Sequence, residues 1–216
     1  QALLLFDGLA IDQWCKIRGR LAEKLSSIEI DEGACFAWLP SLTSVSRQTV
    51  FSGLRPREFA GSIESTAAEP TLWAKFWQDA GLRKSEVVYL KGVKRREDIS
   101  RIADAVSNPN IKIAGIVVDM VDEIVHGATL GKRGIASQID DWCDTGFVEQ
   151  LMTLLLDQGF EIYLTSDHGN VDATGVGRLS QGVLSELKGE RVRVYRSADL
   201  ASSVPAELDT FRFDLP

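Results

Sequence analysis

The stretch Ala2-Leu-Leu-Leu-Phe6-Asp7-Gly8 opens the chain with an apolar run that ends abruptly at a carboxylate and a glycine. A short run that is wholly apolar is typical of a strand covered on both faces of a sheet. The stretch Ile113-Ala-Gly-Ile-Val-Val-Asp119 repeats this pattern in the middle of the chain. These two stretches predict central strands of an α/β fold.

Four further runs predict strands, and the amphipathic stretches between them predict helices. The strands are Ala34–Leu39, Glu86–Leu90, Phe160–Ser166 and Val192–Tyr195, and the helices are Ile11–Leu25, Leu72–Ala80, Arg96–Val106 and Gly134–Gln158. Strands that alternate with helices imply a mostly parallel central sheet with helices on both faces. No repeat, low-complexity linker or change of composition divides the chain, so we expect one domain over residues 1–216. Because the chain opens inside a strand and ends without a final element, we expect a fragment of a longer protein.

Composition excludes several classes of protein. Hydrophobic residues make up 44% and charged residues 25% of the 216, as in a globular domain. No apolar run is long enough to span a bilayer, so we expect no membrane association. The net charge of −7 argues against a broad basic face for nucleic acid. Three cysteines, an odd number without metal-ligand spacing, argue against a secreted disulfide framework and for the cytoplasm.

Polar side chains follow four of the predicted apolar runs. They are Asp7, Thr43 after Phe36-Ala-Trp-Leu-Pro-Ser-Leu42, Asp119 with Asp122, and Asp167 with His168. In open α/β sheets ligands bind beyond the carboxyl ends of the strands. We therefore expect these residues, distant in sequence, to meet at one edge of the sheet.

Two of these pieces combine a carboxylate with an imidazole. Asp167 and His168 are adjacent and precede a glycine, so both side chains can turn toward one cation, and zinc accepts oxygen and nitrogen ligands together. Asp122 and His126, spaced i and i+4, share one face of a helix. The alternatives are a loop turn with a surface histidine for the first pair and a solvated helix start for the second. Asp119 is a rival for the ligand role of Asp122.

The other two pieces supply a carboxylate and a hydroxyl. Asp7 precedes a glycine at a strand end, a place suited to a metal ligand or to a helix cap. Thr43 is expected at a helix N-terminus, where the helix dipole and nearby backbone N–H groups also attract phosphate. A threonine hydroxyl is a poor nucleophile until a bound divalent metal lowers its pKa. Thr43 is therefore a candidate nucleophile, with a simple N-cap as the alternative.

The order of the pieces resembles that of the alkaline phosphatase superfamily. An apolar strand with Asp-Gly is followed by Pro-Ser-Leu-Thr at 40–43 with Thr-Val-Phe-Ser-Gly at 49–53, then Asp-x-x-x-His-Gly at 122–127, then Ser-Asp-His-Gly at 166–169. The chain is most similar to the PglZ domains of bacterial phage-resistance systems, above all over Thr165–Arg178. The resemblance covers nearly the whole chain and implies an alkaline-phosphatase-like core that works with other phage-defence proteins.

The resemblance also implies two divalent metal ions, with zinc favoured and manganese as the alternative. The implied ligands of the first ion are Asp7, Thr43, Asp167 and His168, and those of the second are Asp122 and His126. The superfamily commonly supplies a further histidine to the second ion, whereas this sequence has two histidines in all. The second site is therefore incomplete in this chain, unless Asp119 or Asp172 serves, the missing ligand lies beyond Pro216, or the site holds a single ion.

The implied reaction is an in-line displacement at phosphorus, in which Thr43 attacks, a covalent phosphothreonine forms and water hydrolyses it. Arg47, one turn after Thr43, and Arg178 are candidates to hold the phosphate through paired hydrogen bonds, although such arginines also pair with local carboxylates. We expect a phosphodiesterase that acts on nucleotides or nucleic acid. The alternatives are a phosphomonoesterase or phosphomutase, and a catalytically weak scaffold or sensor domain in a phage-defence complex.

Overall fold

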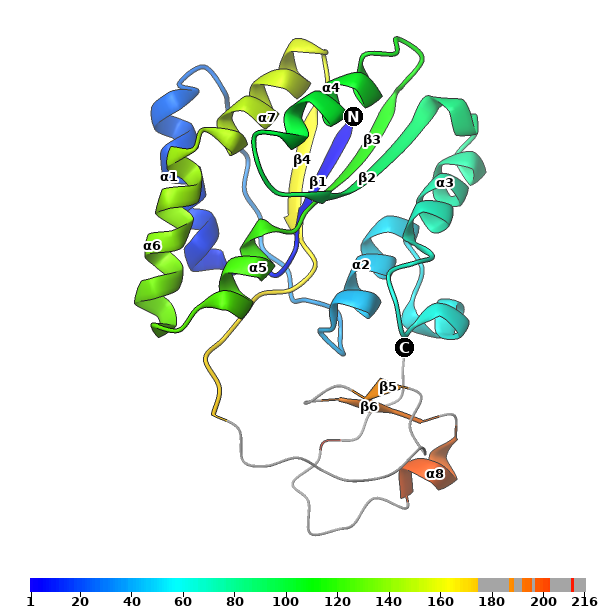
Figure 1. Ribbon diagram of the computed structural model, residues 1–216. Helices are drawn as coiled ribbons and strands as arrows, with labels where there is room; N and C mark the ends of the chain where they lie inside the picture. The colour runs from blue at the N-terminus through cyan, green and yellow to red at the C-terminus, as the bar shows by residue number, and fades with distance from the viewer. Residues whose placement is uncertain (175–186, 189–191, 196, 203–210, 212–216) are drawn as a thin grey trace.

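The computed structural model describes residues 1–174, 187–188, 192–195, 197–202 and 211. Within these residues the core is a four-stranded parallel sheet with the strand order β2-β3-β1-β4. The strands are β1 (Ala2–Phe6), β2 (Val87–Val93), β3 (Ile113–Val118) and β4 (Ile162–Ser166). The first strand of the chain thus lies inside the sheet, between β3 and β4 (Figure 1). The predicted α/β fold with a parallel central sheet is confirmed.

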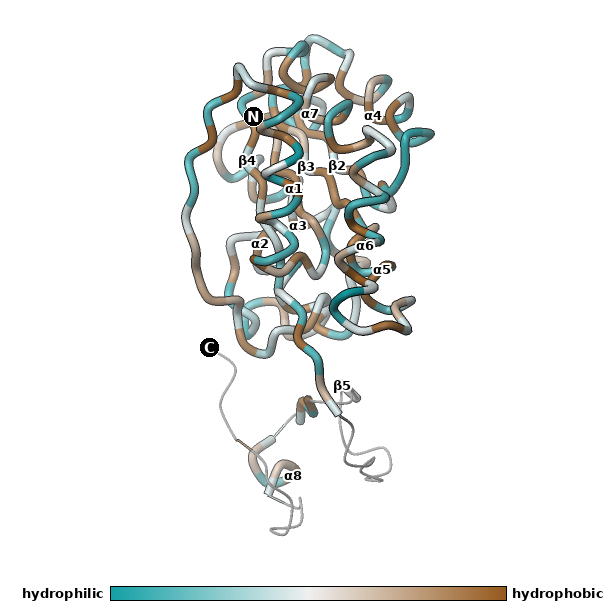
Figure 2. Tube along the Cα trace, turned by 90° about the vertical axis from the view of Figure 1, so that its left-hand side faces the viewer, coloured by the Kyte–Doolittle hydropathy of each residue, from teal (hydrophilic) through white to brown (hydrophobic). Residues whose placement is uncertain are grey.

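Helices cover both faces of the sheet (Figure 1). One face packs against α1 (Ile11–Lys24), α4 (Asp98–Val106), α5 (Met120–Gly127), α6 (Gly131–Asp144) and α7 (Phe147–Asp157), and the other against α2 (Thr43–Ser52) and α3 (Glu69–Asp79). Successive side chains of a strand point to opposite faces, so Leu4 and Phe6 join the first cluster and Leu5 joins the second. Figure 2 shows the apolar strands inside and the mixed colouring of the outer helices.

Short elements complete the described part of the chain. They are the 3-10 helices η1 (Pro56–Ser62) and η2 (Lys84–Glu86), the strands β5 (Leu187–Lys188) and β6 (Arg193–Val194), and the helix α8 (Ala198–Ser202). Among the helices of the described residues, none has the length and apolar character that a membrane crossing requires.

The predicted strand Ala34–Leu39 is wrong, because this segment forms no strand. The run is apolar but contains no β-branched residue, and Phe36 is fully exposed. Thr43 consequently follows a loop and begins α2, so the residues expected to meet come from three strand ends and one helix N-terminus.

Two other predicted elements have different limits. The predicted helix Gly134–Gln158 is two helices, α6 and α7, because the chain turns at Gly146 with a left-handed φ of 75°. The predicted strand Val192–Tyr195 is reduced to β6, which pairs antiparallel with β5 and does not join the central sheet. The other predicted strands and helices are found with ends shifted by a few residues.

A close approach between Gly115 and Trp73 fixes the position of α3 on the sheet. A Cβ at Gly115 would lie 2.9 Å from Trp73 Cε2. The indole cannot easily move, because its Nε1 donates to the carbonyl of Val88 at 3.0 Å and its ring packs edge-on against Phe51. The substitution Gly115→Ala should therefore lower the free energy of unfolding by about 1–3 kcal/mol, as overpacking typically does.

Urea denaturation measures this effect, with Gly19→Ala as the matched control. Nothing lies within 4 Å of a Cβ at Gly19, which is exposed on α1. Alanine is the better helix former by about 1 kcal/mol, so the control should be as stable as the parent chain or more stable. A Gly115→Ala variant that matched this control would contradict the packing of Trp73 described above.

Candidate metal centre

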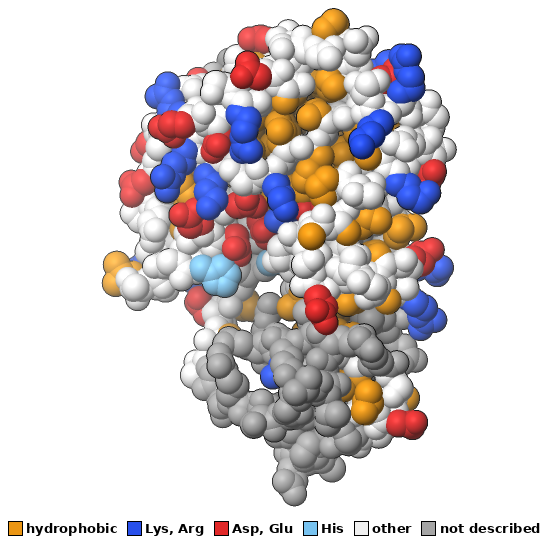
Figure 3. Space-filling model, turned by 45° about the vertical axis from the view of Figure 1, so that its right-hand side comes forward, with side chains coloured by type: hydrophobic (Ala, Val, Ile, Leu, Met, Phe, Trp, Pro, Cys, Tyr) orange, Lys and Arg blue, Asp and Glu red, His pale blue; other side chains and the backbone are white. Residues whose placement is uncertain are grey.

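The register of the sheet brings three aspartates to the same edge. Phe6 is the Cα partner of Val118 on one side and of Ser166 on the other. The next residues of the three strands are Asp7, Asp119 and Asp167. Figure 3 shows acidic side chains and imidazoles close together on one face of the molecule. The ends of β1, β3 and β4 therefore lie at one edge of the sheet, as expected for parallel strands.

Asp7, Asp167 and His168 form the most compact part of this edge. Each offers one ligand atom, and these atoms lie within 4.8 Å of one another. His168 Nε2 is 3.4 Å from Asp167 Oδ2 and 3.9 Å from Asp7 Oδ1. In the described structure both of these carboxylate oxygens are buried without a hydrogen-bond partner. Because buried, unpaired carboxylate oxygens are costly, this donor set fits a divalent cation.

Backbone groups orient the ligands toward the centre of the cluster. The N–H groups of Gly8 and His168 both donate to Asp167 Oδ1, at 3.0 and 2.9 Å, which turns Oδ2 inward. Gly8 can make this contact because its φ of 69° permits a tight turn after β1. His168 Nδ1 lies 3.0 Å from the carbonyl of Gly169, so we assign the proton to Nδ1. Nε2 then carries the lone pair with which the imidazole could bind a cation.

Thr43 reaches the same cluster from the N-terminus of α2. It is the first residue of α2 and is half-buried, and its Oγ1 lies 3.0 Å from His168 Nε2. Two ligands of a tetrahedral zinc ion, each about 2 Å from the metal, lie about 3.3 Å apart. The hydroxyl and the imidazole are therefore close enough to share one ion.

The carboxylates of the cluster crowd negative charge into a buried space. Burial raises the pKa of Asp167 to about 7, and the charge of Asp7 contributes to the shift. Burial and the charge of Asp7 also raise the pKa of Asp122. Burial raises the pKa of Asp119 as well, against the opposing effect of Arg47. A divalent cation would supply positive charge in addition to that of Arg47 and would favour the ionised form of these carboxylates.

Asp122 and His126 lie on α5 as an i, i+4 pair, with His126 Nε2 3.3 Å from Asp122 Oδ1. Asp122 reaches the cluster, because a Cβ built on Gly8 would lie 3.5 Å from Asp122 Oδ1 and 3.7 Å from His168 Cε1. The side chain of His126 is 79% exposed. The structure thus brings Asp122 beside the first group of ligands and leaves His126 at the rim.

Arg47 is buried among carboxylates. Its Nη1 donates to Asp7 Oδ2 at 3.0 Å and to Asp119 Oδ1 at 3.4 Å, and its Nη2 donates to Glu69 Oε2 at 2.6 Å. Burial alone would lower the pKa of Arg47, but the hydrogen bond and charge of Glu69 raise it above its ordinary value. The sequence left Arg47 either as a phosphate contact or as a partner of local carboxylates, and in the structure it pairs with carboxylates.

Asp172 is exposed and does not belong to the compact group. Arg178 falls outside the described residues.

Four residues near the cluster were not singled out from the sequence. They are Glu69, Tyr89, Gln13 and Asn170. Asn170 donates to the carbonyl of Gly8 at 2.7 Å and pairs with Gln13, which ties the loop after β4 to the turn after β1. Asn170 directly follows Ser-Asp-His-Gly, and this position in the sequence could have marked it as a residue near the cluster. Glu69 precedes Pro70 at a helix start, where an acidic residue is common, so nothing local distinguished it.

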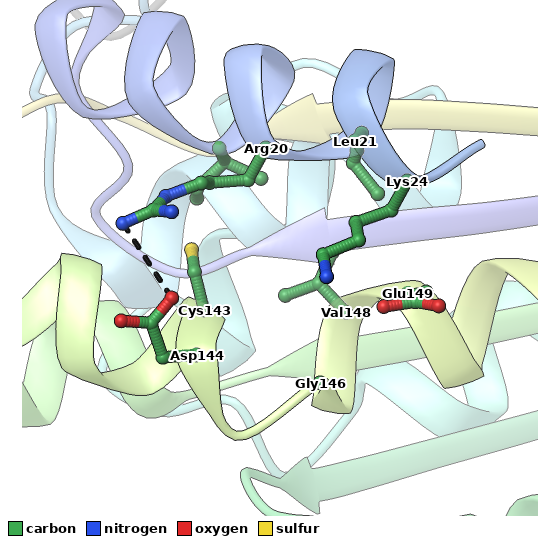
Figure 4. A pocket seen from close by; sticks show the side chains of 9 residues that line it. Arg20, Leu21, Lys24, Cys143, Asp144, Gly146, Val148 and Glu149 are labelled. Carbon is green, nitrogen blue, oxygen red and sulfur yellow. Dashed lines mark ion pairs between the residues drawn. The ribbon is translucent and has the colours of Figure 1, made fainter. Parts of the chain in front are cut away.

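A separate small pocket lies between α1, α6 and α7 (Figure 4). Its lining includes Arg20, Lys24 and Cys143, and none of its lining residues belongs to the metal cluster. Burial raises the pKa of Cys143 to about 11, so its thiol stays protonated near neutral pH. The lining residues of this pocket therefore do not form a second metal-binding group like that of Asp7, Asp167 and His168.

The comparison with protein families agrees with the geometry. The family model that matches the chain is described as the BREX system PglZ alkaline phosphatase-like domain, and the match extends over residues 1–214. No curated protein matches the chain. The resemblance to PglZ domains is thereby confirmed, and it points to a phosphoesterase-type role in a phage-defence system. The chain belongs to the PglZ family of alkaline phosphatase-like domains.

Proposed function

We propose that the chain is a metal-dependent phosphodiesterase that acts on nucleotides or nucleic acid within a BREX defence system, with Thr43 as the nucleophile. The observation that carries this proposal is the position of Thr43 Oγ1, 3.0 Å from His168 Nε2 at the edge of the Asp7–Asp167–His168 group. His168 Nε2 is also the atom that faces the two unpaired carboxylate oxygens, so the hydroxyl and these oxygens share one neighbour. The family membership independently supports phosphoester chemistry.

In this proposal the side chains divide the work between binding and attack. Asp7, Thr43, Asp167 and His168 would hold the first ion, and Asp122 and His126 would hold the second. When bound, divalent ions lower the pKa of a ligated hydroxyl and offset the charge on the phosphoryl oxygens. Thr43 attacks phosphorus in line with the leaving group, and the bond to that group breaks as the bond to Oγ1 forms. Water then cleaves the phosphothreonine and restores the hydroxyl.

The helix that begins at Thr43 supports the same step. The positive end of the α2 dipole lies where negative charge would gather on the phosphoryl group. Arg47 pairs with three carboxylates inside the protein, which favours a role in holding these side chains over contact with the phosphate. Arg178 remains the candidate for that contact.

Zinc is the favoured ion, because the cluster mixes carboxylate, hydroxyl and imidazole ligands, and manganese is the alternative. We also treat the chain as one domain of a cytoplasmic protein that works with other phage-defence proteins. The odd number of cysteines favours a reducing compartment.

A second candidate function is a scaffold or sensor domain that binds metal but turns over substrate weakly. The exposure of His126 favours it, because the second ion would then be poorly held. Comparing bis(p-nitrophenyl) phosphate with p-nitrophenyl phosphate tests the proposal. Faster hydrolysis of the diester is expected, faster hydrolysis of the monoester would indicate a phosphomonoesterase, and no hydrolysis of either by metal-loaded protein would indicate the scaffold.

The two ions are expected to bind with unequal affinity. The first has four candidate ligands around buried oxygens, whereas Asp122 and an exposed His126 give the second only two unless Asp119 joins them. Catalytic zinc usually has about three protein ligands. Calorimetric titration of zinc into chelated protein should therefore show one tight and one weak equivalent. Two equally tight equivalents would contradict the incomplete second site.

A further inference from the structure

The guanidinium of Arg47 ties together three elements that surround the metal cluster. Arg47 lies on α2, one turn after Thr43, and its side chain is 6% exposed. Nη1 donates to Asp7 at the end of β1 and to Asp119 at the end of β3, while Nη2 donates to Glu69 at the start of α3. One rigid, planar group thus spans two strand ends and a helix start.

Glu69 fixes the orientation of that guanidinium. Its carboxylate is completely buried, and Oε2 accepts from Arg47 Nη2 at 2.6 Å. Tyr89 on β2 donates its hydroxyl to the same oxygen. The carboxylate is therefore held by two donors, and the arginine bound to it presents Nη1 to Asp7.

This arrangement divides the two oxygens of Asp7 between two tasks. Oδ2 accepts from Arg47 at 3.0 Å. Oδ1 has no hydrogen-bond partner in the described structure and faces His168 Nε2 at 3.9 Å. The hydrogen bond to Arg47 uses a lone pair of Oδ2 and fixes the plane of the carboxylate, which leaves Oδ1 as the better placed oxygen for a cation. The geometry selects Oδ1 before any ion arrives.

We propose that Arg47 and Glu69 are positioning residues that hold Asp7 as a one-oxygen ligand of the metal cluster. The inference rests on the proposed function, because it assumes that Asp7 binds the ion. It assigns Arg47 no contact with substrate. Arg47 acts through Asp7, and Glu69 acts through Arg47.

A role of Arg47 as a counter-charge and a role in positioning Asp7 predict opposite changes in metal affinity when Arg47 is replaced. If Arg47 served only as a counter-charge, the variant Arg47→Met would remove a repelling cation and bind a divalent ion more tightly. If Arg47 positions Asp7, the same variant frees Oδ2, changes the coordination and weakens binding about 10-fold to 100-fold, as loss of a group that orients a ligand typically does. Arg47→Lys keeps the charge but loses the forked geometry, so its affinity should fall between those of Arg47→Met and the parent chain.

The experiment loads the chelated protein with Co²⁺ and measures the visible absorption spectrum and the dissociation constant by competition with a chelator, without substrate. Arg47→Met, Arg47→Lys and Glu69→Gln should all weaken binding and alter the spectrum in the same direction. Glu86→Gln is the matched control, because Glu86 is also a buried carboxylate, paired with Arg83 and Lys112 at the opposite end of the sheet. It should leave both the spectrum and the affinity unchanged even where it lowers the melting temperature.

The outcomes separate this inference from the proposed function. If the parent chain binds no Co²⁺, the metal centre itself is wrong and the positioning role falls with it. If the parent chain binds Co²⁺ and the variants bind it equally well, or Arg47→Met binds it more tightly, the positioning role alone is wrong. Glu69→Gln and Arg47→Lys keep the test decisive if Arg47→Met fails to fold.

Discussion

Thr43→Ala is expected to reduce phosphoester turnover by at least about 10³-fold, because removal of a nucleophile abolishes the covalent route. The fold should survive, since Thr43 is half-buried at a helix start and its described hydrogen-bond partner there is His168. The rate of diester hydrolysis at saturating metal, together with the melting temperature, measures both expectations. The hydroxyl is the group at issue, so Thr43→Ser should retain far more activity than Thr43→Ala.

Ser44→Ala is the control for this substitution. Ser44 is the next residue of α2 and carries the same functional group, but among the described residues the hydrogen bond to His168 is made by Thr43 and not by Ser44. Its removal should leave the rate within a few-fold of the parent chain. A Thr43→Ala variant with the parent rate, beside a Ser44→Ala variant without activity, would show that the nucleophile has been assigned to the wrong residue.

Asp167→Asn should be more stable than the parent chain without metal and less stable than the parent chain with metal. Without metal, the variant removes a buried charge and places an amide N–H near Asp7 Oδ1, one of the two unpaired oxygens. We expect a gain on the order of 1–3 kcal/mol in the free energy of unfolding. With metal present the parent chain is stabilised by binding, by about 2.7 kcal/mol at a metal concentration 100 times Kd, and the variant loses most of this.

The metal-free difference should depend on pH in a definite direction. Burial raises the pKa of Asp167 to about 7, above the value of about 4 for an unfolded chain. A raised carboxylate pKa means that ionisation destabilises the folded state. The advantage of Asp167→Asn should therefore be absent below about pH 4, grow between pH 4 and pH 7, and be complete above pH 7.

Chemical denaturation across this pH range, with chelator and then with zinc, measures both effects. Asp157→Asn, an exposed aspartate near the end of α7, is the control and should show neither the pH dependence nor the dependence on metal. Equal stability of Asp167→Asn and the parent chain in chelator would mean that the Asp167 carboxylate is not strained by its burial.

The sequence predicted the parts of the fold that follow from local pattern. The strands β1, β3 and β4 are each followed by an aspartate, and parallel strands end at a common edge, so the convergence of Asp7, Asp119 and Asp167 could be predicted. The apolar run Ala34–Leu39 was predicted as a strand but forms none, because an apolar segment becomes a strand only where another strand is available to pair with it. The predicted helix Gly134–Gln158 is divided at Gly146, and the sequence did not show the division because the helical spacing of apolar residues continues on both sides of this glycine.

The contacts around Arg47 could not be read from the sequence. Glu69 is 22 residues away and Tyr89 is 42 residues away, and each looks ordinary in its own segment. Only packing of α2 and α3 on the same face of the sheet brings them together. The inward orientation of Asp167 likewise depends on a backbone N–H of Gly8, 159 residues away in the sequence. Such tertiary contacts decide which oxygen of a carboxylate is free.

The most direct test of a metal-dependent phosphodiesterase is reconstitution of activity together with a metal count. The chelated protein is assayed with bis(p-nitrophenyl) phosphate while zinc or manganese is returned in measured equivalents. We predict no turnover in the chelated protein, recovery as the first and second equivalents bind, and no recovery in Thr43→Ala at the same metal content. Equal turnover before and after chelation, or no turnover with metal fully bound, would contradict the account.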